Sequence, residues 1–153
     1  MEQIIIYDTT LRDGMQGTGI NFTLSDKLQI ARELDELGID YIEGGFPLAN
    51  KKEAEFFNRL KQERFKHAKI VAFGSTRQPN IKAENDPHIE ALLQAETPAV
   101  TVVGKTWKAH VELVLHTSLQ ENLNMIYDSI ATLKKAGREV IFDLEHFLSL
   151  IHI

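Results

Sequence analysis

The chain has 153 residues, of which 43% are hydrophobic and 25% charged, a composition typical of a soluble globular protein with one ordinary domain. It contains no cysteine, which excludes disulfides and thiolate chemistry and fits a cytoplasmic protein. The net charge of -5 argues against general nucleic-acid binding, and no apolar stretch is long enough to span a membrane.

Strand-like and helix-like segments alternate along the chain. An amphipathic helix is predicted to begin near Ser25 and to end at Gly38, with an inward face of Leu28, Ala31, Leu34 and Leu37. Short runs rich in β-branched residues predict buried strands at 3–7, 40–43, 69–73, 99–103 and 139–143.

Three further helices complete the alternation. One is predicted at about 51–63, and a short one follows Asp86-Pro87. The longest opens at Ser118, where Ser118 and Glu121 have capping-box spacing, and Gly137 ends it. Its predicted inner stripe is Leu119, Leu123, Ile126, Ile130 and Leu133.

Regular β-α alternation predicts parallel strands joined by right-handed crossovers. A doubly wound open sheet and a (β/α)8 barrel both fit this order. Neither GxGxxG nor GxxxxGK[ST] follows the first strand, which counts against a nucleotide-binding open sheet. Polar residues cluster just after the predicted strand ends instead, where a barrel places its active site.

The loop after the first strand carries Asp8, Arg12, Asp13 and Gln16. A carboxylate there could bind a divalent cation, and the arginine could hold a carboxylate or an enolate oxygen. A polar turn with a structural salt bridge is the alternative. Glu43 ends the second strand before two glycines, and it could face a ligand or bind loop amides.

The later strand ends carry further candidates. Arg77 could bind an anion such as phosphate or be a solvated charge. His110 could act as an acid–base group or have a structural role, and Asp143 and Glu145, next to His146, could hold a proton or orient a substrate. The other histidines show no metal-ligand spacing and are interpreted as incidental: His67, His88, His116 and His152.

The stretch "DTTLRDGMQ", residues 8–16, resembles the opening motif of a family of metal-dependent TIM-barrel acyltransferases and lyases. The family includes 2-isopropylmalate, homocitrate and citramalate synthases and the hydroxymethylglutaryl-CoA lyases. The stretches "LDELGIDYIEGGFP", "KIVAFGSTR", "ALLQAETPAVTVVGKTWKAHV" and "GREVIFDLEHF" are most similar to the citramalate synthases. The resemblance extends from Ile4 to about Phe147.

This resemblance implies a role for each site residue. Asp13 would be a ligand of a divalent metal (magnesium, manganese or zinc), and Arg12 would polarise a carbonyl and steady the enolate. Glu145 would take part in activating acetyl-CoA. The expected substrate-binding residues are Gln16, Glu43, Thr101, Thr106 and His110.

The implied reaction is a Claisen-type condensation of acetyl-CoA with pyruvate to give citramalate, for isoleucine synthesis. The expected partners are these two small molecules and a second copy of the parent protein, with no nucleic acid or membrane. The alternatives are a 2-isopropylmalate or homocitrate synthase, which accept larger keto acids, and a non-catalytic barrel fragment.

The chain also departs from the family pattern. It predicts about five βα units, the N-terminal portion of a (β/α)8 barrel, and it lacks the downstream HxH pair that completes the metal site. We therefore expect a partial pyruvate carboxyltransferase-type barrel over residues 1–147, with the tail "LSLIHI" at 148–153 foreign to it. Open strand edges predict a marginally stable, inactive fragment, with the activity belonging to a longer parent.

Overall fold

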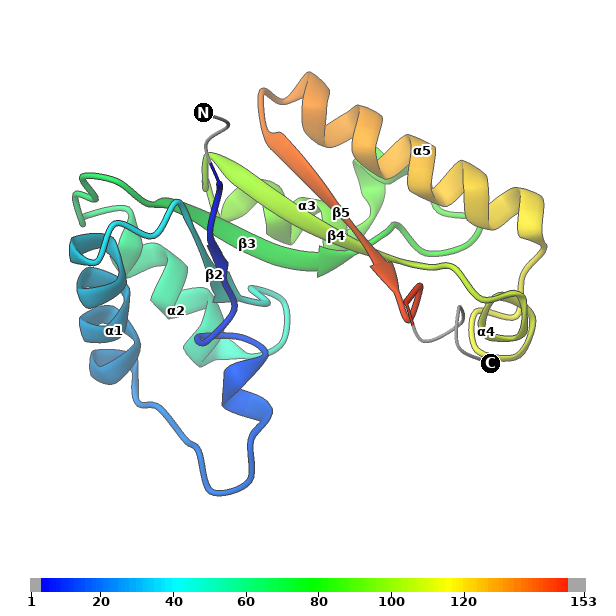
Figure 1. The fold of residues 1–153 in the computed structure, drawn as a ribbon. Coiled ribbons are helices and arrows are strands. Elements are labelled where there is room, and N and C mark those ends of the chain that lie inside the picture. Colours follow the sequence, from blue (N-terminus) through cyan, green and yellow to red (C-terminus); the bar gives the residue numbers. More distant parts are fainter. Residues whose placement is uncertain (1–3, 149–153) are drawn as a thin grey trace.

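The structure, a computed structural model, describes residues 4–148. Its strands form one parallel sheet in sequential order, which confirms the predicted alternation and the α/β class. The carboxyl ends of all five strands therefore meet at one edge of the sheet (Figure 1). The strands are β1 (Tyr7–Asp8), β2 (Tyr41–Gly45), β3 (Lys69–Ser75), β4 (Ala99–Lys105) and β5 (Glu139–Glu145).

Helices connect each strand to the next and cover one face of the sheet (Figure 1). Local capping sets where they begin: Thr23 and Asp26 form a capping box for the first long helix, and Asp86 caps the helix that opens at Pro87. The helices are α1 (Leu24–Glu36), α2 (Lys51–Leu60), α3 (Pro87–Gln94), α4 (Lys108–Leu113) and α5 (Leu119–Lys135), with short 3-10 turns η1 (Gly14–Gln16) and η2 (Ala83–Asn85).

The sheet curls into part of a barrel. In a flat sheet, β1 and β4 would lie about 14 Å apart, because two strands separate them. The hydroxyls of Tyr7 on β1 and Thr101 on β4 nevertheless lie 2.6 Å apart. Tyr41 on β2 likewise donates a hydrogen bond to Glu139 on β5 at 2.6 Å. Both contacts require a concave face, so the five strands form a half-barrel.

The two faces of the sheet have different partners. Glu43 on β2 points into the concave face toward Tyr7. The next residue, Gly44, lies against α2, since a Cβ there would come within 2.9 Å of Phe56 and 3.3 Å of Phe57. The main apolar core fills the space between the convex face and the helices, with Ile42, Phe56, Ala72, Leu92, Val102 and Leu133 among its buried members.

One carboxylate joins the end of α1 to the segment before β3. The side chain of Asp35 is buried and accepts hydrogen bonds from the backbone N–H groups of Lys66, His67 and Ala68 at 2.7–2.8 Å. Burial favours the neutral acid, but the three donors and the nearby His67 outweigh it, so the pKa of Asp35 lies below its ordinary value. Asp35 therefore stabilises the fold as a carboxylate.

Several predicted details are wrong at the sheet edge and on the helix faces. The segment at 4–6 is not a buried strand: Ile4 is 84% exposed, because β1 is an edge strand with no element covering this segment. The remaining residue of that predicted strand, Gln3, lies outside the described residues. Leu37 is 77% exposed, whereas Lys27 and Asp35 on the same helix are buried.

The longest helix begins where predicted, but two of the five residues in its predicted stripe are misplaced. Ser118 caps α5 by accepting a hydrogen bond from the backbone N–H of Glu121. Leu119 and Leu123 are exposed, and the buried residues are Asn122, Met125, Ser129 and Leu133. The first turns pack on α4 and on polar loop groups rather than on the core, and α4 itself was not predicted.

Candidate active site

Glu43 is the centre of a buried polar group on the concave face. Its side chain is 1% exposed and comes from β2, near the carboxyl edge of the sheet. The Nε of Arg12 donates to Oε1 at 2.5 Å, and the hydroxyl of Tyr7 donates to Oε2 at 2.5 Å. Both carboxylate oxygens thus have a donor, as a buried charge requires.

The hydrogen-bond direction at Tyr7 is fixed by counting protons. Its hydroxyl has one hydrogen, which goes to Glu43, so the hydroxyl of Thr101 must donate to the Tyr7 oxygen at 2.6 Å. Burial and the adjacent carboxylate of Glu43 raise the pKa of Tyr7 far above its ordinary value. Tyr7 therefore remains a protonated donor at physiological pH.

Arg12 is oriented on two further sides. Its guanidinium carbon lies 4.0 Å from the ring centroid of Phe73, and its Nη1 lies 3.2 Å from the carboxylate of Asp13. A planar cation held over an aromatic face keeps one orientation, so its remaining N–H groups point in a defined direction. Arg12 and Gln16 line a pocket of about 280 Å³ together with Met15, Phe46 and Phe73.

The turn after β1 places these side chains. The backbone N–H groups of Arg12 and Gly14 both donate to the carbonyl of Thr9, which reverses the chain. The carboxylate of Asp8 accepts from the backbone and the hydroxyl of Thr10 at 2.9 and 3.0 Å, so it stabilises this turn. Asp13 is 60% exposed, and it is the acid that faces solvent here.

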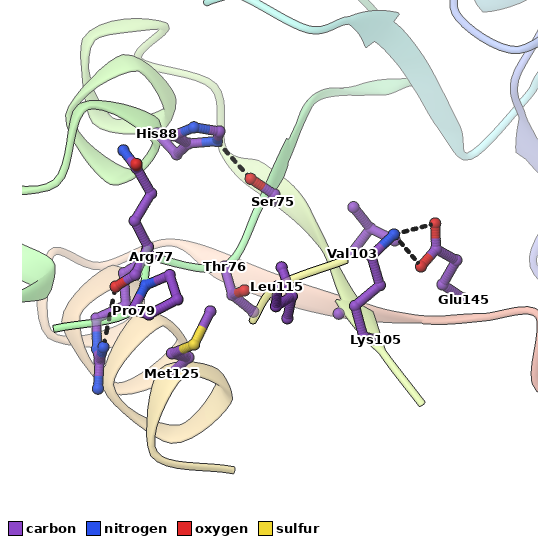
Figure 2. Close-up of a pocket in the computed structure, with 12 residues that line it drawn as sticks. Ser75, Thr76, Arg77, Pro79, His88, Val103, Lys105, Leu115, Met125 and Glu145 are labelled. Atoms are coloured by element: carbon purple, nitrogen blue, oxygen red, sulfur yellow. Dashed lines mark hydrogen bonds and ion pairs between the residues drawn. The ribbon is translucent and has the colours of Figure 1, made fainter. Parts of the chain in front are cut away.

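A second polar group lies at the carboxyl ends of β4 and β5 (Figure 2). Lys105 contacts both carboxylate oxygens of Glu145, at 2.8 and 2.5 Å. The hydroxyl of Thr106 donates to the backbone carbonyl of Glu145 at 2.6 Å, which ties the two strand ends together. Both side chains of the ion pair are about a quarter exposed and border a pocket of about 170 Å³.

His110 on α4 stands beside this ion pair. Its Nδ1 lies 4.0 Å from Oε2 of Glu145 and, among residues 4–148, is buried without a hydrogen-bond partner. Its ring packs on Trp107 and on His146, with ring centroids 4.6 and 5.5 Å apart. An orphaned ring nitrogen next to a carboxylate is suited to exchanging a proton with a bound molecule.

Two side chains on the other wall of this pocket were missed by sequence reasoning. The hydroxyl of Ser75, at the end of β3, forms a short hydrogen bond with Nδ1 of His88 on α3 (Figure 2). His88 was interpreted as incidental, yet its ring also packs near Phe46 at the other polar group. Its position at the start of α3, 13 residues after Ser75, gave no signal of this contact.

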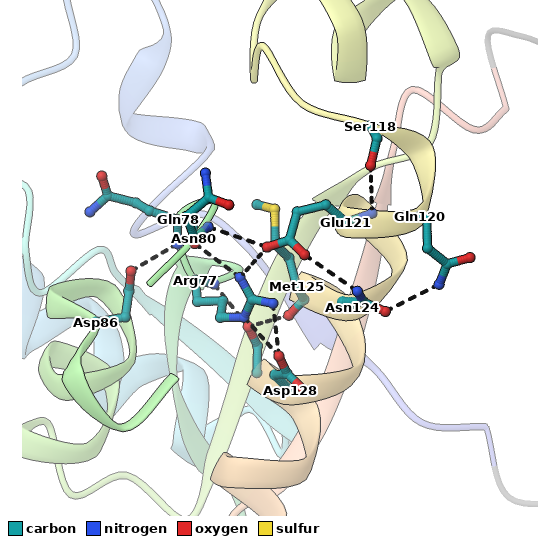
Figure 3. A network of polar contacts seen from close by, with 11 residues as sticks. Arg77, Gln78, Asn80, Asp86, Ser118, Gln120, Glu121, Asn124, Met125 and Asp128 are labelled. Atoms are coloured by element: carbon teal, nitrogen blue, oxygen red, sulfur yellow. Dashed lines mark hydrogen bonds and ion pairs between the residues drawn. The ribbon is translucent and has the colours of Figure 1, made fainter. Parts of the chain in front are cut away.

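Arg77 is a structural residue. Its side chain is 6% exposed, with Nε 2.9 Å from Asp128 and Nη1 2.7 Å from Glu121, both on α5 (Figure 3). Its backbone N–H donates to the hydroxyl of Ser129 at 2.8 Å. The interpretation as a solvated charge is therefore wrong, and carboxylates of α5 already bind the guanidinium that was interpreted as a phosphate ligand.

The expected site residues thus fall into two groups. Arg12, Glu43 and Thr101 meet through Tyr7, with Asp13 and Gln16 beside Arg12. Thr106, His110 and Glu145 meet through Lys105 and the strand ends. No hydrogen bond or ion pair between side chains joins one group to the other within the described part of the chain.

The alternation of side chains along the strands is a signal that predicts the positions of the two linking residues, Tyr7 and Lys105. Thr101, Val103 and Lys105 share the concave face of β4, because side chains two residues apart point to the same side. Tyr7 precedes the turn of the opening motif and lies on the same face as Glu43. Sequence reasoning named Thr101 and Glu43 on the strands but did not single out Tyr7 or Lys105 as site residues.

The described residues do not form a metal site by themselves. No cluster of three or more His, Asp or Glu side chains in residues 4–148 is arranged to hold a metal ion. Asp13 offers one exposed carboxylate next to Arg12. A divalent cation that prefers six or more oxygen ligands would need the others from elsewhere.

Comparison with known proteins shows the family to which the chain belongs. The HMGL-like family profile matches residues 3–150. The chain belongs to the HMGL-like family. The HMG-CoA lyase of Bacillus subtilis has the same fold, with a TM-score of 0.69 at 20% identity over 93% of this chain and 46% of the lyase.

The curated sequence relatives of this HMGL-like chain share more of its sequence than the solved structure does. Five (R)-citramalate synthases are 47–56% identical to it. That of Aquifex aeolicus is 56% identical over 146 residues, which are 95% of this chain and 28% of the relative. The 2-isopropylmalate synthase of Oceanobacillus iheyensis is 31% identical over 145 residues, 95% of this chain and 27% of the relative.

The HMGL-like chain therefore spans a little over a quarter of the curated relatives that it matches. Within residues 4–148, none of its helices combines the length and the apolar character needed to cross a membrane.

Proposed function

We propose that the full-length protein is an (R)-citramalate synthase, an acyltransferase that condenses acetyl-CoA with pyruvate. The observation that carries this proposal is the gap in identity over the same segment: 56% to a citramalate synthase and 31% to a 2-isopropylmalate synthase. In this reaction the methyl carbon of acetyl-CoA bonds to the keto carbon of pyruvate. Water then breaks the thioester C–S bond, which releases CoA and citramalate.

The arrangement of Arg12 supports a role in stabilising charge during the condensation. Glu43 and Phe73 hold its guanidinium in one orientation beside a pocket, so N–H donors are in place before an oxyanion develops. Gln16 borders the same pocket and would bind substrate there. Glu43, held between Arg12 and Tyr7, would act by fixing the arginine.

The second group suits handling of the acyl donor. Glu145 is paired with Lys105 and lies close to Nδ1 of His110, which has no hydrogen-bond partner within residues 4–148. Glu145 would take part in removing a proton from the acetyl methyl group. Thr106 holds the strand end that carries Glu145, and Thr101 holds Tyr7. Thr101, Thr106 and His110 would then border the keto-acid pocket.

Asp13 is proposed as the one metal ligand among the described residues. A bound magnesium, manganese or zinc ion would supply polarisation of the keto acid, with its remaining ligands from outside residues 4–148. The proposal also includes a cytoplasmic homodimer, a partial barrel domain over residues 1–147 and a separate tail at 148–153. Of that tail, residues 149–153 lie outside the described residues.

The test is CoA release by the full-length protein from acetyl-CoA with pyruvate or with 2-oxoisovalerate, with and without added divalent metal. Metal-dependent release with pyruvate alone supports the citramalate synthase. Preference for 2-oxoisovalerate would make it a 2-isopropylmalate synthase, and 2-oxoglutarate tests the homocitrate alternative. No release with any keto acid would overturn the proposed function and leave only the barrel fold.

A further inference from the structure

A buried ion pair between Lys27 and Glu53 lies against the strand that carries Glu43. Lys27 of α1 is 0% exposed, and its Nζ donates to both carboxylate oxygens of Glu53, at 2.9 and 2.8 Å. Glu53 lies in the first turn of α2 and is itself buried. The ammonium also lies 4.4 Å from the ring centroid of Phe56. None of the roles assigned above uses this pair.

A buried ion pair seldom adds stability over apolar side chains of the same size, because both charges lose their hydration. Such a pair is better explained by a conformation that it selects. The question is therefore which part of the chain the Lys27–Glu53 pair contacts.

The pair contacts the backbone of Gly45. A Cβ at this position would lie 2.0 Å from Oε2 of Glu53 and 3.1 Å from Nζ of Lys27, so only glycine leaves room for the pair. Gly45 also has a φ of +144°, which side chains disfavour. At the same place, the pairing of β2 with β3 shifts register between Glu43 and Gly45, a bulge.

The bulge is adjacent to the site. Glu43 is its first residue, and its carboxylate is the group that holds Arg12 and Tyr7. Glu53 borders the same pocket as Arg12 and Gln16. The ion pair thus lies against the bulge, and its Glu53 stands at the border of the pocket that Arg12 also lines.

We propose that Lys27 and Glu53 are positioning residues: their ion pair fixes the β2 bulge and thereby aims Glu43 at Arg12. The catalytic consequence of this role rests on the proposed function. The geometric part of the proposal, the position of Glu43 relative to Arg12, is independent of the proposed function.

The test replaces the pair by apolar side chains of similar size, Lys27→Met/Glu53→Leu, in the full-length protein. We expect kcat for CoA release to fall about a hundredfold, as a displacement near 1 Å can cause, with the melting temperature near that of the wild type. The matched control is Arg32→Met/Glu63→Leu. This exposed pair joins α1 to the residues after α2 with N–O distances of 2.6 and 2.9 Å, and its loss should leave kcat unchanged.

A mutant cycle with Glu43→Gln separates positioning from a general structural effect. If the pair acts through Glu43, replacing it in the Glu43→Gln background should lower kcat no further. An equal loss in both backgrounds, or an unchanged kcat in the first, would overturn the proposal. If Lys27→Met/Glu53→Leu does not fold, the neutral amide pair Lys27→Gln/Glu53→Gln takes its place in the same cycle.

A crystal structure of the same variant gives a readout that needs no activity. We expect the Arg12 Nε to Glu43 Oε1 distance to increase beyond the hydrogen-bonding range from 2.5 Å. An unmoved Glu43 would refute the positioning role. A wild-type protein that releases no CoA would refute the proposed function instead, and the crystal structure would still decide the positioning role.

Discussion

The hydroxyl of Thr101 on β4 meets that of Tyr7 on β1 at 2.6 Å, and Tyr7 in turn donates to the buried carboxylate of Glu43. This short chain of hydrogen bonds joins three strands across the concave face. It connects the curvature of the sheet with the orientation of Arg12, because Glu43 is shared between Tyr7 and the guanidinium.

Replacing Tyr7 by Phe tests how much the hydrogen bonds of the Tyr7 hydroxyl contribute to stability. The variant leaves a buried carboxylate oxygen of Glu43 and the hydroxyl of Thr101 without their partner, so we expect a loss of about 1–3 kcal/mol in the free energy of unfolding. Chemical denaturation measures it. The matched control is Tyr41→Phe, whose hydroxyl bonds the exposed Glu139 and whose loss should cost under about 0.5 kcal/mol. Equal losses in the two variants would contradict the argument.

Replacing Arg12 by Lys keeps the charge and removes the planar fork. A lysine cannot donate to Glu43 and stack on Phe73 in the same geometry, so we expect kcat for CoA release to fall by about 10²–10³. Arg59→Lys serves as the control, because Arg59 forms an exposed pair with Glu55 one helical turn away. An Arg12→Lys enzyme with near wild-type kcat would rule out oriented charge stabilisation by Arg12.

The carboxylate of Asp35 should make stability depend on acid. Its pKa is lowered in the folded state, so its stabilisation is fully present above the unfolded value of 3.8 and is lost as pH falls through the folded pKa. Asp35→Asn should cost about 2–3 kcal/mol near neutral pH and flatten the fall in stability below 3.8. Denaturation at several pH values measures both effects, with the exposed neighbour Glu36→Gln as control. A wild-type slope retained in Asp35→Asn would assign the acid sensitivity to other groups.

Removing the Arg77 guanidinium should lower the stability of the fold without affecting substrate binding. Arg77→Met deletes its pairs with Glu121 and Asp128 and leaves the packing of its aliphatic part, so we expect a loss of about 3 kcal/mol in unfolding free energy. The KM for pyruvate should not change, because the guanidinium is already paired with Asp128 and Glu121 of α5 (Figure 3). The comparison is Arg59→Met, an exposed arginine. A raised KM with unchanged stability would restore a ligand-binding role for Arg77.

Apart from α4, the order of strands and helices was predictable because each element has its own local signals. Asp86 before Pro87 and Ser118 before α5 are capping residues that act within one turn, and both helices begin where these residues predict. The parallel pairing followed from alternation alone. The edge of the sheet was not predictable in this way, since the exposure of Ile4 depends on which elements cover β1.

The candidate site was predictable as a set of positions, not as a set of contacts. The opening motif marked Arg12 and Asp13, and the strand ends marked Glu43 and Glu145. That Tyr7 donates to Glu43, or that Lys105 pairs with Glu145, depends on side chains brought together by the curl of the sheet. Lys27 was missed for a related reason. A lysine on a helix is usually exposed, and its burial here depends on pairing with the buried carboxylate of Glu53.

The contact between Tyr7 and Thr101 can form only after both of their strands have been synthesised. The two residues are 94 positions apart, and Tyr41 and Glu139 are 98 apart. At about 5–20 residues per second of synthesis, Tyr7 leaves the ribosome several seconds before Thr101 is made. Helices α1 and α2 have their local partners by then, but the concave face does not. The hydroxyl of Tyr7 therefore acquires its hydrogen bond from Thr101 only after the segment carrying β4 has joined the sheet.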